Sequence, residues 1–147
     1  SMYCLCMRIL HGRGLHYMDD MWKCLSKARI EQSLQCLKSA RILLEHEDYR
    51  GAANRSYYAI FHAMRSVLAL DNKDFSKHAG VISCFRKDYL KTGELPRDLS
   101  PIITLAFEVR SDCDYDDYCL ENFCQSLKSL GFIRVQDSWF SRAGCNI

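Results

Sequence analysis

The stretch from residue 50 to residue 70 is the part of this chain that most limits its possible folds. Its apolar side chains recur at helical spacing and cover more than half of the helix circumference; they are Ala52, Ala53, Tyr57, Ile60, Phe61, Met64, Val67 and Leu68. Small residues in the same run, among them Ala59 and Ala63, would let a neighbouring helix approach closely. A helix that is apolar on so many sides must be surrounded by other elements. The sequence therefore predicts a central helix of a bundle.

Other helical segments supply the neighbours of this helix. Apolar periodicity predicts them over residues 19–46, 77–89, 101–110 and 120–130. Asp48 is a candidate N-cap for the central helix, Ser100-Pro101 is a strong helix start, and Gly131 is a C-terminal stop. With only 2 Pro and 7 Gly, the chain favours long helices over many turns. The predicted fold is an all-α, up-and-down bundle of four to five helices.

The chain is expected to form one domain with two extensions. Its 147 residues are enough to bury a single core. Residues 1–18 and 132–147 carry no reliable period, so the first is expected to be a flexible N-terminal extension and the second a C-terminal tail. The bundle itself is predicted to span residues 19–131.

Composition limits the classes of function and location. A chain with 48% hydrophobic and 26% charged residues is expected to be soluble and globular. The net charge of +2 is too small for nucleic-acid binding by overall charge, so only a local basic site could serve. No apolar run is long enough to cross a membrane. We expect a cytoplasmic protein without membrane contact.

The nine cysteines predict free thiols better than a metal site. They include no Cys-x-x-Cys pair, which is the usual zinc-ribbon spacing. Cys113, Cys119 and Cys124 lie close together in the sequence and leave a metal cluster as the alternative. Unpaired thiols in a reducing cytosol are the preferred interpretation. Neither a metal nor another cofactor is predicted.

Two polar residues interrupt the apolar character of the central helix. Arg55 and His62 are seven positions apart; at about 100° per residue they project from nearly the same side. One interpretation is a binding or catalytic site. The other is a buried structural pair, with Arg55 bonded to Asp112 or Asp114. The sequence does not decide between them.

Three stretches together resemble the HEPN family of small helical-bundle proteins. Residues 52–63 look like the signature second helix of its stand-alone bacterial and archaeal branch, which is related to toxin–antitoxin systems. Residues 77–83 look like the short third helix, and residues 107–117 resemble the arginine-to-tyrosine segment after the fourth. The three motifs occur in the family's order, and the similarity covers about residues 26–130.

The resemblance implies an all-α homodimer, often a toxin ribonuclease partnered with a nucleotidyltransferase-type antitoxin. Catalytic members carry an arginine, a polar residue and, a few positions later, a histidine. Arg110 and Ser111 match the first two, but Tyr115 stands where the histidine is expected. This difference puts catalysis in doubt.

Metal-independent RNA cleavage requires a general base, a general acid and a cation for the phosphate. Tyr115, with a reference pKa near 10, is a poor base at neutral pH. His62 or His78 could replace the missing imidazole if the fold brings it near Arg110.

Two functional hypotheses follow. The first is a toxin–antitoxin-type domain that binds a nucleotide, RNA or a nucleotidyltransferase partner, with Arg55, His78 and Arg110 as binding residues. The second is an active, metal-independent endoribonuclease, with Arg110, His62 and Tyr115 as catalytic residues.

Overall fold

The computed structural model describes residues 14–111 and residue 122. Within these residues every regular element is helical, and no strand occurs. This confirms the all-α fold class. The elements, in chain order, are α2 (Gly14–Glu45), α3 (Tyr49–Leu70), α4 (His78–Phe85), the π-helical turn η1 (Arg86–Leu90) and α5 (Leu99–Ser111).

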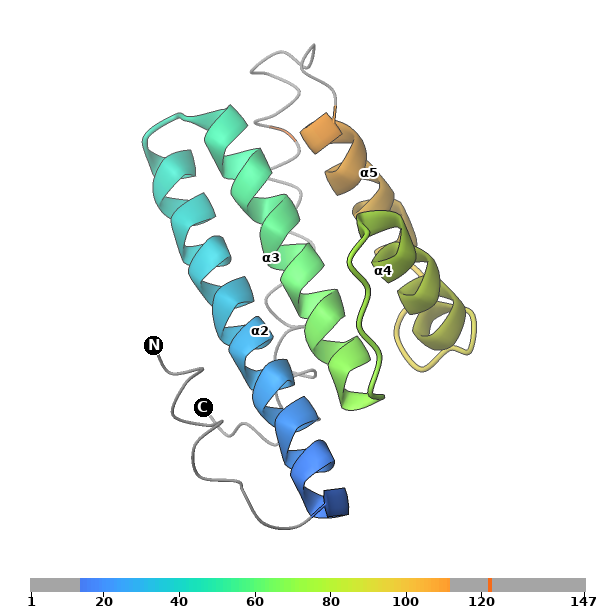
Figure 1. The fold of residues 1–147 in the computed structure, drawn as a ribbon. Coiled ribbons are helices and arrows are strands. Elements are labelled where there is room, and N and C mark those ends of the chain that lie inside the picture. Colours follow the sequence, from blue (N-terminus) through green and yellow to red (C-terminus); the bar gives the residue numbers. More distant parts are fainter. Residues whose placement is uncertain (1–13, 112–121, 123–147) are drawn as a thin grey trace.

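The helix α3 is the centre of the bundle, as its sequence predicts. Figure 1 shows α2 and α3 as a long antiparallel pair, with α4 and α5 on the other side of α3. More than half of the α3 side chains are buried, including Tyr57, Phe61 and Met64. Val81 and Phe85 of α4 join the same core, as do Ile103 and Val109 of α5.

Small residues bring α2 and α3 close together. On α2, Ser26 and Ser33 are seven residues apart, and on α3, Ala59 and Ser66 have the same spacing. The Ser33 hydroxyl donates to the Ala59 carbonyl over 2.6 Å. The hydroxyls of Ser26 and Ser66 lie 2.9 Å apart, and each also contacts the carbonyl of the other residue. The interface is therefore close-packed and fixed in register by buried hydrogen bonds between side chains and backbone.

Most predicted helix boundaries agree with the structure within a few residues. The predicted N-cap is confirmed, because the Asp48 carboxylate accepts a hydrogen bond from the Gly51 amide. The main difference at the start is that α2 begins at Gly14, inside the segment expected to be an extension. The third predicted helix is α4 continued by η1. The helix predicted over 120–130 lies outside the described residues, apart from residue 122.

Ion pairs hold the connection between α3 and α4. Arg29 of α2 is buried, and its guanidinium lies 2.8 Å from the Asp74 carboxylate. Arg65 of α3 contacts the other oxygen of the same carboxylate over 2.9 Å. Asp74 therefore joins two helices to the segment that leads into His78.

None of the described helices combines the length and apolarity that a membrane span requires. Cys36 and Cys84 form no disulfide, and the three cysteines of the alternative metal cluster lie outside the described residues.

Candidate functional site

The guanidinium of Arg110 lies on two tyrosine rings of α3. Its central carbon is 5.0 Å from the centroid of the Tyr57 ring and 5.2 Å from that of Tyr58. One terminal nitrogen donates to the Tyr58 hydroxyl over 3.0 Å. Within the described residues Arg110 forms no ion pair, and its buried Nε has no hydrogen-bond partner. The rings thus orient a cation whose charge these residues leave uncompensated.

His78 reaches the same tyrosine from the start of α4. Its Nδ1 shares a short hydrogen bond with the Tyr57 hydroxyl. The imidazole also stacks on Phe61, with ring centroids 4.2 Å apart. Burial lowers the pKa of His78 below 6.5, and the nearby charges of Arg110 and Arg65 lower it further. His78 is therefore neutral at pH 7 and can accept a proton.

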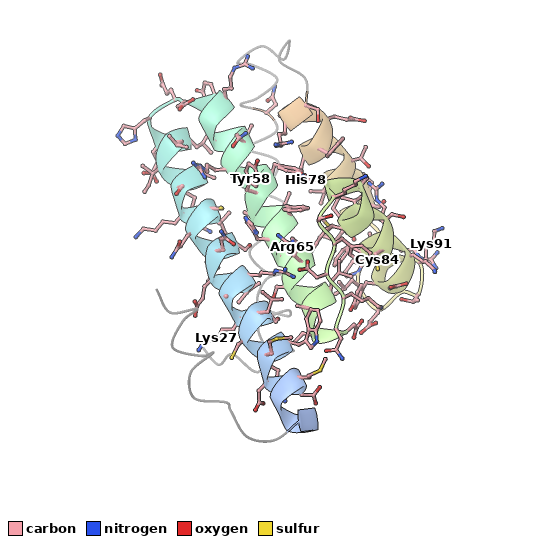
Figure 2. The ribbon with its side chains drawn as sticks, viewed as in Figure 1. Lys27, Tyr58, Arg65, His78, Cys84 and Lys91 are labelled. Carbon is pink, nitrogen blue, oxygen red and sulfur yellow. The ribbon has the colours of Figure 1, made fainter. Side chains whose placement is uncertain are left out.

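Phe107 of α5 completes this group of side chains. Its ring contacts Tyr57 at a centroid distance of 6.1 Å and remains 38% exposed. We call Tyr57, Tyr58, His78, Phe107 and Arg110 the Arg110 cluster. Tyr58 and His78, labelled in Figure 2, show how α3 and α4 contribute to it on the side of α3 where α5 packs. The fold therefore brings together residues from three helices.

His62 lies next to the Arg110 cluster without forming a bond to Arg110. Its ring stacks on Tyr58 at 6.1 Å between centroids, and its buried Nδ1 has no hydrogen-bond partner among the described residues. Burial, together with the smaller effects of the charges of Arg65 and Arg29, lowers its pKa to about 4. His62 is thus an uncharged imidazole at neutral pH.

The low pKa of His62 predicts a loss of stability in mild acid. An unfolded histidine binds its proton near pH 6.5, whereas folded His62 does so at about 4. Between these values the unfolded state binds more protons, so the free energy of unfolding falls as the pH is lowered. After allowance for partial exposure, we expect a fall of about 2 kcal/mol.

Chemical unfolding of wild type and His62→Phe between pH 7 and pH 4 measures this effect. The substitution should remove most of the fall, whereas His46→Gln, at an exposed histidine, should leave it unchanged. Parallel pH profiles of wild type and His62→Phe would contradict the prediction.

Arg55 does not belong to the Arg110 cluster. It is exposed and interacts with the Cys36 thiol of α2. Of the two alternatives for Arg55, the buried structural pair does not fit, because the side chain is exposed on α3 beside α2. Its proposed partners Asp112 and Asp114, and the predicted catalytic Tyr115, lie outside the described residues.

Three members of the Arg110 cluster, Tyr57, Tyr58 and Phe107, were not predicted as site residues. Tyr57 was counted only among the apolar residues of the central helix, and Tyr58 is half-buried and accepts the bond from Arg110. Phe107 lies three residues before Arg110 on α5, so helical spacing alone places the two on one face. That spacing was the available signal in the sequence.

Comparisons with known proteins agree with the family resemblance. The chain is 36% identical over 83 residues to a UPF0332 protein of Thermotoga maritima. The matched region covers 56% of this chain and 63% of that protein. Two proteins of Methanocaldococcus jannaschii named "Putative toxin" are also similar. One is 38% identical over 89 residues, covering 60% of this chain and 66% of the relative. The other is 33% identical over 102 residues, covering 69% of this chain and 66% of the relative.

The matched regions span just under two thirds of the length of each of these relatives. No solved structure matches the chain significantly. The HEPN domain profile matches residues 26–129, which includes α3, α4, α5 and most of α2. The chain therefore belongs to the HEPN domain family.

Proposed function

We propose that this HEPN domain is a toxin-type RNA-binding domain in which Arg110 binds a phosphate of the RNA. The observation that carries the proposal is the position of the Arg110 guanidinium on Tyr57 and Tyr58, without a carboxylate partner among the described residues. A guanidinium that is already oriented loses little entropy when its remaining donors bind a phosphate. The toxin names of two relatives support the biological setting.

The protonation states of the two histidines favour binding over cleavage. Cleavage requires a base for the 2′-hydroxyl and an acid for the leaving oxygen. His62 and His78 both have lowered pKa values, so both are neutral at pH 7 and neither carries an extra proton to donate. With a pKa of about 4, His62 is also a weak base. Burial also raises the pKa of Tyr57 above 10, which makes it a weak acid. The described residues thus supply a cation and a base without an evident acid.

Metal-independent RNA cleavage is the second candidate function. The observation that favours it is that Arg110 and His78 contact the same ring, that of Tyr57. In this alternative, Arg110 stabilises the phosphate and His78 or His62 acts as the base. Tyr115 keeps its predicted catalytic role in this alternative, whereas the predicted role of Arg55 in RNA binding belongs to the first function. A homodimer and a nucleotidyltransferase-type antitoxin partner also remain predictions from the family.

RNA binding by Arg110 variants tests the proposed function. Fluorescence anisotropy with a labelled, mixed-sequence, single-stranded RNA at low salt should show binding by wild type. Arg110→Ala should weaken this binding about tenfold or more, because a charged hydrogen-bonded contact contributes about 1.5–3 kcal/mol. Arg110→Lys should fall between the two, since lysine keeps the charge but lacks the planar fork of donors.

Arg41→Ala is the matched control, because Arg41 is an exposed arginine on α2. An Arg110→Ala variant that binds RNA as tightly as wild type would contradict the proposal. Gel analysis of the same mixtures distinguishes the two functions. Cleavage that disappears in both Arg110→Ala and His78→Ala would establish the ribonuclease instead.

A further inference from the structure

Phe107 is unusual among the aromatic residues of the bundle because much of its ring is open to solvent. It is 38% exposed, whereas Tyr57, Phe61, Phe85 and Tyr89 are each less than 5% exposed. Its ring is tilted by 59° against that of Tyr57. Tyr57 therefore supports Phe107 from one side without covering it.

Phe107 lies on the same face of α5 as Arg110, and both residues contact Tyr57. The residues are three apart on α5, so their side chains leave the same face of the helix about 5–6 Å apart at Cβ. Both contact the Tyr57 ring, which fixes them relative to each other. A cation for the phosphate thus lies beside an aromatic surface on which a base can stack.

We propose that Phe107 stacks against an unpaired base of the nucleotide whose phosphate Arg110 binds. This inference rests on the proposed function and makes it more specific. A base must leave a duplex to lie on an aromatic ring, and stacking of this kind is the usual way proteins hold single-stranded RNA. The site therefore favours single-stranded RNA over duplex RNA through base stacking.

Binding of three RNA probes tests the role of Phe107. The probes are a labelled single strand, the same strand with abasic central positions, and the strand paired to its complement. Wild type should bind the single strand about tenfold more tightly than the other two, since one stacked base contributes about 1–3 kcal/mol. Phe107→Ala should lower the affinity for the single strand to the abasic level and leave abasic binding unchanged. Phe107→Tyr should retain the preference.

Leu105→Ala is the matched control, because Leu105 is 39% exposed on the same helix. A single strand carrying 2-aminopurine adds a spectroscopic readout, in which binding to wild type changes the fluorescence of this base and Phe107→Ala abolishes most of that change. Thermal melting of each variant verifies the fold.

The outcomes separate the two proposals. If Arg110→Ala weakens binding but Phe107→Ala does not, the stacking inference is overturned while the proposed function stands. Equal affinity of wild type for intact and abasic strands also overturns it. If wild type binds none of the RNAs, both proposals fall.

Discussion

Replacing Asp74 by asparagine should lower the free energy of unfolding by about 3 kcal/mol, because the substitution leaves a buried arginine without its carboxylate. Removing one partner of a buried ion pair typically costs about 3–5 kcal/mol. The Arg29 side chain is only 6% exposed, but that of Asp74 is 39% exposed. Water can therefore compensate part of the loss, so the expected cost lies at the lower end of this range. Urea unfolding of the two proteins measures it.

The opposite substitution, Arg29→Met, should cost only about 1 kcal/mol. Asp74 would keep its ion pair with Arg65 and its contact with solvent, and methionine can fill the space of the arginine stem. If Asp74→Asn and Arg29→Met lowered the free energy of unfolding equally, the buried charge of Arg29 would not be the reason for the loss in Asp74→Asn.

The stability contributed by Asp74 should also depend on pH. Burial tends to raise its pKa, but hydrogen bonds and charges from Arg65 and Arg29 outweigh burial and hold the pKa below 3.8. Because the folded-state pKa is depressed, the contribution is present above pH 3.8 and is lost as the pH falls through the lower value. Wild type and Asp74→Asn should therefore converge in stability in strong acid.

Replacing Ala59 by leucine should be at least as damaging, with a loss of about 3 kcal/mol or more. Ala59 is 0% exposed, and its carbonyl lies 2.6 Å from the Ser33 hydroxyl of α2. Overpacking of a core typically costs about 1–3 kcal/mol. The cost is higher here because the added atoms would force two long helices apart and strain the buried bonds that join them.

Ala79→Leu provides the control for this substitution. Ala79 is an exposed alanine on α4, so the same chemical change should alter stability by less than about 0.5 kcal/mol. Calorimetric or chemical unfolding of both variants gives the comparison. An Ala59→Leu protein that melts at the wild-type temperature would show that the α2–α3 interface has room for the larger side chain.

Helical periodicity in the sequence was sufficient to predict the architecture. The apolar run of α3 identified the central helix, and local capping chemistry identified Asp48, because both signals depend on near neighbours in the chain. The pairing of Arg29 with Asp74 was not predicted, since it joins residues 45 positions apart in the sequence. The buried serines of α2 were missed for the same reason, because burial of a serine depends on its partner helix.

The sequence predicted some of the residues of the site but not the contacts that these residues make. Arg110, His62 and His78 were selected from the sequence, and the structure places Arg110 and His78 against Tyr57, with His62 beside Tyr58. Arg55 was grouped with His62 because the two positions share a helix side. Their surroundings nevertheless differ, since Arg55 is exposed beside Cys36 and His62 is half-buried. Helical spacing predicts the side of the helix from which a side chain projects, but it does not predict which residues or solvent surround that side chain.

The seven-residue spacing of small side chains between α2 and α3 has a consequence for alignment. Ser26, Ser33 and Ala40 recur at this interval, so a slide of one helix by two turns would again set small residues against small residues. The spacing of small residues alone does not select one alignment, so the buried serine hydrogen bonds and the Arg29–Asp74 pair together distinguish the native alignment from its shifted alternatives. Asp74 lies four residues before His78, so the same pair also determines where His78 meets Tyr57. Weakening it should broaden the set of helix alignments and, with it, the positions that His78 occupies.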